Sequence, residues 1–152
     1  MSAAGGQYDA LSLKNQLCFP IYLCSKEITR RYSAILNELD LTYTQYIVMM
    51  FFWEMESSNV KELGEALMLD PSTLTPILKK LESKGYLKRK RLPEDERILT
   101  VTLTETGKTL RTKALTVPEK IRKCYGLTDD ESTQLYGLII KLLSNVEKEQ
   151  EL

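Results

Sequence analysis

The chain has 152 residues, of which 43% are hydrophobic and 28% are charged, and its 21 basic residues are balanced by 21 acidic ones. This composition predicts one globular domain with a real core, and the zero net charge excludes nucleic-acid binding through overall basicity. The sequence contains no histidine, which removes the commonest general base, the Ser-His-Asp triad and histidine-containing zinc sites. The missing histidine argues against ordinary hydrolysis. We expect no enzymatic activity, no metal site and no cofactor.

Two further features concern the compartment. No apolar run approaches the length of a membrane span, and the opening "MSAAGGQYDA" has neither the basic nor the apolar segment of an export signal. Three cysteines are an odd number, which favours reduced thiols over a disulfide framework. We expect a cytoplasmic protein with no membrane partner.

The first predicted element is a long amphipathic helix over residues 10–39, because apolar side chains recur there at steps of three and four residues. It should end near Asp40. The ring of Pro20 removes a backbone donor and crowds the carbonyl of Gln16, which predicts a kink next to Cys18. Cys18 would lie more than one turn into this helix, too far from the N-terminus to gain much from the helix dipole.

A second helix follows "LTYT", with Thr42 or Thr44 as its cap. Its segment "YIVMMFFWEM" is apolar almost all round, as expected of a helix buried in a core, and "ESSN" ends it. Asn59 can then cap a short helix that ends near Leu67.

The next helix opens with Asp70 as cap and Pro71 at the first helical position, and it runs to Lys84, where Gly85 stops it. Two short helices joined by a tight turn predict a helix-turn-helix, whose second helix is the candidate reader of DNA.

After Gly85 the hydrophobic period changes from helical to alternating. "YLKRKR" and "RILTVTL" are predicted to be two strands, and "LPEDE" between them has the length and composition of a hairpin turn. A helix-turn-helix followed at once by a hairpin is a winged helix. The predicted fold class is therefore mainly α with a small β-hairpin.

The C-terminal part is predicted to be helical again. Thr104 caps a fifth helix that Pro118 interrupts, and Thr128 with Glu131 forms a capping box that opens a last helix over residues 129–149. This last helix and the first one are more apolar than a small winged helix needs for its own core. The excess favours a homodimer, which would set two reading helices against successive major grooves. The apolar stripe of the last helix consists of Leu135, Leu138, Ile139, Leu142, Leu143 and Val146.

The charges are segregated along the chain. Residues 79–91 hold seven of the 21 basic residues and one acid, which is the local patch that a nucleic-acid partner needs. Hydroxyl and amine side chains on the reading helix are of the types that reach bases and phosphates, and the basic run has the character of phosphate ligands. The first group comprises Ser72, Thr73, Thr75 and Lys79, and the second comprises Lys80, Lys88, Arg89, Lys90 and Arg91.

The most specific motif lies in the predicted wing, where Asp95-Glu96-Arg97 is followed by five residues and then by Leu103-Thr104. This spacing, together with "LDPSTLTPILKKLESKGYLKRKR", resembles the D-x-R-x5-L-T pattern and reading helix of the MarR family of bacterial transcription regulators. The resemblance extends over nearly the whole chain.

The resemblance implies a single domain over residues 1–152 that forms a homodimer, in most members a repressor on a pseudo-palindromic site in double-stranded DNA. It further implies that Arg97 enters the minor groove and that Asp95 orients it. An arginine at a hairpin tip suits a narrow, electronegative groove, although a salt bridge to Asp95 is the plain alternative. The expected parts are dimerisation helices over residues 10–39 and 105–149 and a DNA-binding lobe over residues 42–104.

Within this family, "NQLCF" and "LTYTQY" resemble the thiol-based, OhrR-like branch. There the cysteine that matches Cys18 senses peroxide, and tyrosines that match Tyr22, Tyr32 and Tyr43 surround it. Tyr22 would lie one turn from Cys18 on the same face, whereas Tyr32 would lie about 21 Å along a continuous helix. The Tyr32 hydroxyl would therefore have to come from the partner subunit.

The leading hypothesis is a repressor released from DNA when organic hydroperoxide oxidises Cys18 to a sulfenic acid, which then condenses with another thiol. Cys24 lies about 9 Å along the helix and is a poor partner unless Pro20 breaks that helix. The resemblance instead points to Cys124 of the other subunit, because some members of the branch carry a second cysteine in that region, which should pack against the partner's first helix. A small cellular thiol is the remaining candidate. Alternatives are a small aromatic or phenolic ligand or another oxidant as the trigger. A thiol peroxidase and a pure interaction module are weaker.

Overall fold

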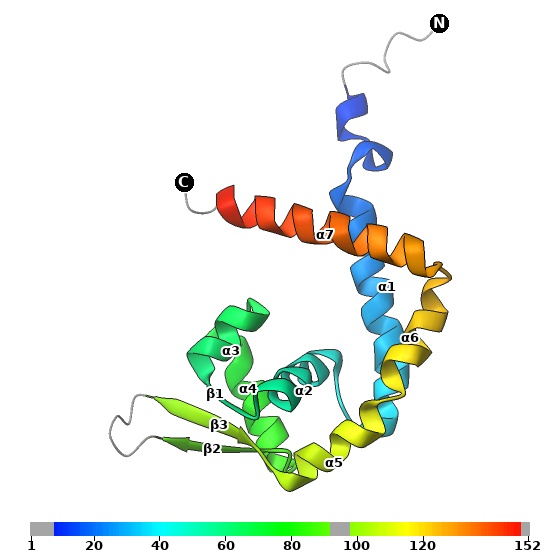
Figure 1. Cartoon of the computed structure of the whole chain (residues 1–152). Coiled ribbons are helices and arrows are strands. Elements are labelled where there is room, and N and C mark those ends of the chain that lie inside the picture. Colours follow the sequence, from blue (N-terminus) through cyan, green and yellow to red (C-terminus); the bar gives the residue numbers. More distant parts are fainter. Residues whose placement is uncertain (1–7, 92–97, 150–152) are drawn as a thin grey trace, which may run out of the picture. The chain divides into compact units, whose positions relative to one another are not determined.

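The computed structural model describes residues 8–91 and 98–149 of the chain. It is mostly helical and carries a small antiparallel sheet, so the predicted fold class is confirmed (Figure 1). The chain divides into two compact units, Met1–Val117 and Pro118–Leu152, which are described separately below. None of the described helices is long and apolar enough to cross a membrane.

Helix α1 (Cys18–Leu36) begins eight residues later than predicted. Ser12, between two short 3-10 turns, and Gln16, between the second turn and the helix, are both extended, so the predicted start at residue 10 is wrong. Pro20 is the third residue of α1, where its missing N–H has no intrahelical acceptor, and the predicted kink inside a longer helix is also wrong. The flanking turns are Asp9–Leu11, Leu13–Asn15 and, after α1, Asn37–Leu39.

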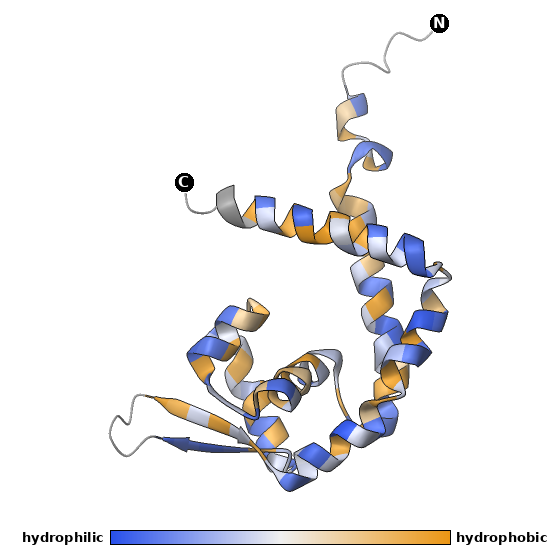
Figure 2. Ribbon diagram, in the orientation of Figure 1, coloured by the Kyte–Doolittle hydropathy of each residue, from blue (hydrophilic) through white to orange (hydrophobic). Residues whose placement is uncertain are grey.

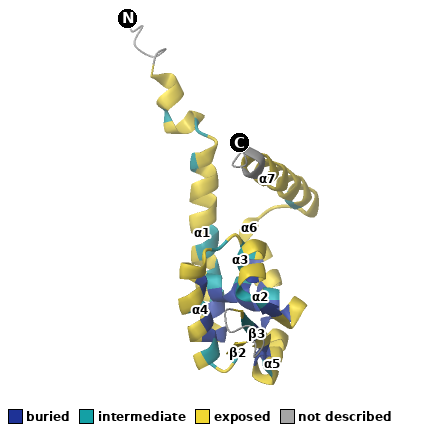
Figure 3. Ribbon diagram, turned by 90° about the vertical axis from the view of Figure 1, so that its left-hand side faces the viewer, coloured by how far each residue is buried: buried dark blue, intermediate teal, exposed yellow. Residues whose placement is uncertain are grey.

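Helix α2 (Tyr43–Met55) lies at the centre of the first unit. Thr42 caps this helix in a capping box with Gln45; it is one of the two caps that the sequence predicted. Its Val48, Met49 and Phe52 are fully buried, and the core gathers around them from α1, α3, α4, the sheet and α5 (Figure 3).

The predicted helix-turn-helix is present. Helix α3 (Val60–Leu67) is capped by Asn59, and helix α4 (Pro71–Ser83) follows Asp70, whose carbonyl accepts from the first amides of the helix. Gly85 ends this motif with φ +75°, a left-handed conformation that glycine adopts without strain.

The sheet has three antiparallel strands in the order β1 (Ser57–Asn59), β3 (Leu99–Leu103), β2 (Leu87–Arg91). Both predicted wing strands are present, and Figure 2 shows the contrast between hydrophilic β2 and hydrophobic β3. Strand β1 is not predicted, because "ESSN" consists of turn-forming polar residues and its partner strand β3 is distant in the sequence.

Helix α5 (Glu105–Ala114) is capped by Thr104, as predicted. Helix α6 (Val117–Tyr125) leads into the second unit, where the Thr128–Glu131 capping box opens α7 (Asp129–Glu149) with the predicted bounds. The stripe residues of α7 are between 36% and 66% exposed: Leu135, Leu138, Ile139, Leu142, Leu143 and Val146.

A substitution at Gly107 tests the packing around α5. It is buried, and a Cβ on it would overlap the Tyr86 carbonyl oxygen and crowd a Leu103 methyl group. Gly107→Ala should therefore lower the free energy of unfolding by about 1–3 kcal/mol, measured by urea denaturation. Gly137→Ala is the control, because nothing lies within 4 Å of the added Cβ and alanine favours the helix. Equal stability of Gly107→Ala and the parent would contradict the packing.

Candidate nucleic-acid interface and thiol site

Helix α4 has one buried and one exposed face. Leu74, Leu78 and Leu81 are at most 1% exposed and fix the helix to the core. The predicted DNA-contacting side chains of this helix all lie on its exposed surface: Ser72, Thr73, Thr75, Lys79 and Lys80. The structure therefore brings these residues together on one surface element.

Thr75 has a hydrogen bond of its own within α4. Its Oγ1 donates to the Pro71 carbonyl at 2.7 Å, which fixes the hydroxyl rotor. The lone pairs of the oxygen remain available as acceptors. Such an acceptor suits the exocyclic amino groups of cytosine and adenine, which are donors in the major groove.

The basic strand β2 presents Lys88 and Lys90 as exposed side chains, and Arg91 is exposed at its end. Within the described part of the chain, no carboxylate forms an ion pair with Lys79, Lys80, Lys88 or Lys90. The two predicted wing-tip residues, Asp95 and Arg97, lie outside the described residues.

Arg89 departs from the prediction of a phosphate ligand. Its Nη2 and Nε lie 2.6 and 2.8 Å from Glu82 Oε2, and its backbone N–H donates to Glu82 Oε1 at 2.9 Å. The Arg89 side chain is only 20% exposed. The guanidinium is thus engaged within the molecule, where it joins the end of α4 to β2, and we remove Arg89 from the proposed phosphate contacts.

Lys84 is a second basic residue of the run that has an internal partner. Its Nζ lies 2.9 Å from Asp40 Oδ2 and also donates to the Asp40 carbonyl, and its side chain is 14% exposed. The hydrogen bond from Lys84 lowers the pKa of Asp40. Fewer than the seven basic residues of segment 79–91 are therefore available to contact a polyanion.

Cys18 is the first residue of α1, so the predicted position more than one turn inside a helix is wrong. The free amides and the partial positive charge of the helix N-terminus lie at this residue, an environment in which reactive cysteines occur. The thiol is exposed, and Tyr22, one turn further along the same face, is 60% exposed.

Three tyrosines form a cluster at the other end of α1. The ring centroids of Tyr32 and Tyr43 are 4.7 Å apart, and those of Tyr32 and Tyr46 are 5.9 Å apart. Because α1 is continuous from Cys18 to Leu36, Tyr32 lies about 21 Å from Cys18 along its own helix. The structure thus joins Tyr32 and Tyr43 but separates both from the Cys18 end of the chain's own α1.

Tyr46 is a member of this cluster that is not among the predicted site residues. It lies three residues after Tyr43 on α2, a spacing that places both on one face and is the signal that was available. Burial raises the pKa of Tyr46, and the neighbouring Tyr43 adds to the effect, so the Tyr46 hydroxyl keeps its proton at neutral pH.

The other two thiols are also exposed and free. Cys24 is on α1, and because the helix runs unbroken past Pro20, it stays about 9 Å from Cys18 along the axis. Cys124 is on α6 in the second unit, where its Sγ lies 3.5 Å from the Lys120 carbonyl. A bridge from Cys18 to Cys124 stays a prediction.

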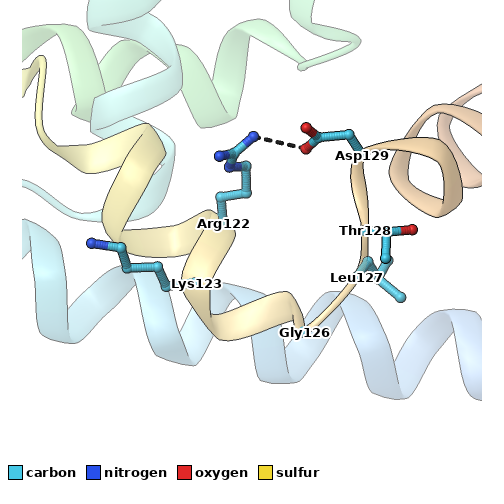
Figure 4. A pocket seen from close by; sticks show the side chains of 6 residues that line it. All are labelled: Arg122, Lys123, Gly126, Leu127, Thr128 and Asp129. Atoms are coloured by element: carbon cyan, nitrogen blue, oxygen red, sulfur yellow. Dashed lines mark hydrogen bonds and ion pairs between the residues drawn. The ribbon is translucent and has the colours of Figure 1, made fainter.

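Each unit has a surface hollow in its described part, and both hollows are open to solvent. In the second unit, a hollow of about 350 Å³ lies where α6 turns into α7, and Arg122 Nη1 and Asp129 Oδ1 pair across it at 2.8 Å (Figure 4). A hollow of about 430 Å³ in the first unit lies between Tyr86 and α5. Neither resembles the enclosed apolar site that a small aromatic ligand prefers. Within the described residues, no cluster of three metal-ligating side chains occurs.

The Arg89–Glu82 pair makes a pH-dependent prediction. Hydrogen bonds from the Arg89 side chain and backbone lower the pKa of Glu82. Because the pKa of Glu82 is lower in the folded state than its ordinary value of 4.5, the pair stabilises the fold at pH values above 4.5. This contribution is lost as the pH falls through the lowered pKa of the folded state. Glu82→Gln should therefore cost about 1 kcal/mol at pH 7, discounted for partial exposure, and much less at pH 3.

The check for this prediction is the urea midpoint of parent and variant at both pH values. Glu65→Gln is the matched control, because the ion pair of Glu65 with Lys61 is exposed and 3.8 Å long. A stability gap that is the same at pH 7 and pH 3 would rule out the charged pair as its source.

Three comparisons place the chain among known proteins. Residues 30–113 match the family model described as transcriptional regulator SarA/Rot. The organic hydroperoxide resistance transcriptional regulator of Bacillus subtilis is 40% identical over 140 residues, which cover 92% of this chain and 95% of that protein. The HTH-type transcriptional regulator SarZ of Staphylococcus aureus is 44% identical over 132 residues, which cover 87% of this chain and 89% of SarZ.

Among solved structures, AbfR of Staphylococcus epidermidis is similar with a TM-score of 0.73 and 33% identity, over 93% of this chain and 98% of AbfR. Further AbfR structures are described as reduced and bound to DNA, overoxidized and bound to DNA, and disulfide-formed. The family match spans more than half of the chain, and the relatives match nearly all of it. The chain belongs to the MarR-type transcriptional regulators and is OhrR-like, and it also matches the SarA/Rot family model.

Proposed function

We propose that this transcriptional regulator is a homodimeric repressor that binds a pseudo-palindromic operator in double-stranded DNA and leaves it when organic hydroperoxide oxidises Cys18. The observation that carries the DNA-binding part is the division of α4 into a face buried through Leu74, Leu78 and Leu81 and an exposed hydroxyl and lysine face. A surface helix with that face and a basic strand nearby in the same unit has what a major groove and its phosphates require.

The proposed contacts divide by chemistry. Ser72, Thr73, Thr75 and Lys79 read base edges, and Lys80, Lys88, Lys90 and Arg91 contact phosphates. The wing arginine, Arg97, enters the minor groove with Asp95 as its partner, as the wing motif implies. The DNA-bound state of AbfR, a relative of similar fold, supports this assignment.

The proposed dimer uses the exposed apolar side chains of α7 and of the N-terminal part of α1. We assign Leu17, which precedes α1 and is 67% exposed, and Ile21, which is 41% exposed, to the dimer interface together with the apolar stripe of α7. Side chains of this size are unfavourable in water, and a two-fold dimer covers them on both copies at once. In this proposal residues 10–39 and 105–149 form the dimer and residues 42–104 form the DNA-binding lobe.

The proposed trigger is a two-step oxidation. The Cys18 thiolate attacks one oxygen of the hydroperoxide, the O–O bond breaks, and the leaving alkoxide takes a proton to become the alcohol, which leaves a sulfenic acid. A second thiol then attacks the sulfur and releases water as the disulfide forms. Tyr32 and Tyr43 of the partner subunit, with Tyr22, would supply the hydroxyl donors to the thiolate.

The decisive experiment follows fluorescence anisotropy of a labelled promoter duplex. Reduced protein should bind, organic hydroperoxide should release it, and dithiothreitol should restore binding. Hydrogen peroxide and a phenolic acid in parallel samples separate the other candidate triggers: release by the phenolic acid alone would overturn the oxidation mechanism and leave the DNA-binding part intact.

Cys18→Ser should bind the duplex like the parent and ignore hydroperoxide, because serine keeps the shape of cysteine and cannot be oxidised. The measurement is the same titration with and without organic hydroperoxide. Cys24→Ser is the matched control on the same helix and should respond like the parent. Release of Cys18→Ser by hydroperoxide would move the sensor to another residue.

A non-reducing gel of the same samples identifies the second thiol. A covalent dimer that forms in the parent, but in neither Cys18→Ser nor Cys124→Ser, supports a bridge between subunits. If instead the parent stays a single chain and gains the mass of a small thiol at Cys18, the bridge is excluded and the sensor is retained.

Arg97→Ala should weaken operator binding by about 1–3 kcal/mol, the range of one good specific contact. Its position in the wing motif is the reason. The comparison is an anisotropy titration of parent and variant at one fixed salt concentration, and equal affinities would remove Arg97 from the interface.

A further inference from the structure

The only tryptophan of the chain, Trp53, links two distant parts of the first unit. It is 7% exposed on α2, and its indole Nε1 donates to the Gly107 carbonyl at 2.9 Å. The two residues are 54 positions apart, so the bond ties α2 to the first turn of α5.

Gly107 packs against the segment of Gly85 and Tyr86, which joins the end of α4 to the first wing strand, β2. Its N–H donates to Thr104 Oγ1 at 3.0 Å, and that oxygen lies 2.6 Å from the Gly85 carbonyl oxygen. The Thr104 N–H donates to the Tyr86 carbonyl at 3.1 Å. A Cβ on Gly107 would overlap that same carbonyl oxygen, so the two backbones are in direct contact.

Trp53 is in turn held by an aromatic column. The Tyr46 ring meets it edge-on, with centroids 6.0 Å apart and planes at 70°, and Tyr46 packs on Tyr32, which packs on Tyr43. Edge and offset contacts of this kind give each ring a preferred orientation. The indole N–H is therefore aimed at Gly107 by packing that reaches back to α1.

We propose that Trp53 is a positioning residue for operator binding: its N–H fixes the backbone at Gly107 and thereby the base of the wing relative to the end of α4. The inference rests on the proposed DNA-binding function. Trp53 is buried and touches no DNA, so its effect passes through Gly107, Thr104 and Tyr86.

The physical reason is the tertiary bond itself. The Gly107 carbonyl lies inside α5 and keeps its intrahelical partner, the N–H of Arg111, but without the indole N–H it loses the bond that joins the first turn of α5 to α2. The first turn of α5 is then less firmly held against α2. A binding surface made of two elements that engage different grooves works only when both are held in register by the residues beneath. The same column ends at Tyr32 and Tyr43, which are the proposed donors to the Cys18 thiolate. A change at the proposed sensor can therefore reach the wing through packed side chains.

The test replaces Trp53 by β-(3-benzothienyl)alanine, which keeps the two fused rings and exchanges the N–H for sulfur. The probe is a duplex selected from a random library by the parent protein, and anisotropy titrations cover a series of salt concentrations. The affinity should fall about three- to tenfold, the range of substitutions in a coupled network. The slope of log affinity against log salt should stay unchanged, because no phosphate contact is removed.

Two comparisons separate positioning from general stability. Tyr46→Phe keeps the ring of the column and should bind like the parent. Thermal melting sets a working temperature at which all variants are fully folded, and hydrogen exchange at residues 104–107 should be faster in the Trp53 analogue.

Equal affinity of the analogue and the parent at that temperature would overturn the inference while the DNA-binding proposal stands. A reduced salt slope would also overturn it, because that would indicate lost phosphate contacts. Failure of the parent to select or bind any duplex would overturn the DNA-binding proposal, and the inference with it.

Discussion

The first unit depends on the burial of α2. This helix is apolar almost all round, and although Met50 and Met55 stay exposed, α1, α3, α4, α5 and the sheet all contact it. Each of these elements gives its apolar side to α2 and turns its polar side outward. The exposed hydroxyl and lysine face of α4 is thus a consequence of the core, since burial of Leu74, Leu78 and Leu81 leaves the helix only one orientation.

The basic run illustrates how a structure divides like charges between two tasks. Arg89 and Lys84 point back to carboxylates, Glu82 and Asp40, and join α4 to its neighbours, whereas Lys79, Lys88 and Lys90 remain on the surface. A partly buried arginine pair with three short contacts holds a fixed geometry, which exposed lysines do not. The internal pairs thereby hold the element that carries the outward charges.

The elements that could be predicted from the sequence are those with local signals. Thr42, Asn59, Thr104 and Thr128 each cap a helix within reach of their own backbone, so sequence patterns are sufficient to find them. The late start of α1 depends on extended residues that periodicity does not reveal, and β1 depends on pairing with a strand some 40 residues away. The Trp53–Gly107 bond and the Arg89–Glu82 pair are tertiary, and no spacing rule indicates either partner.

The position of Cys18 at the start of α1, with Pro20 as the third residue, has a mechanical consequence. Unwinding a helix from its end costs one hydrogen bond per residue and needs no new nucleus, whereas a break in the middle needs two helix ends where there were none. A bulky group attached at the first residue can be accommodated by fraying of a single turn. An adduct further along α1, for example on Cys24, has no helix end beside it that could fray.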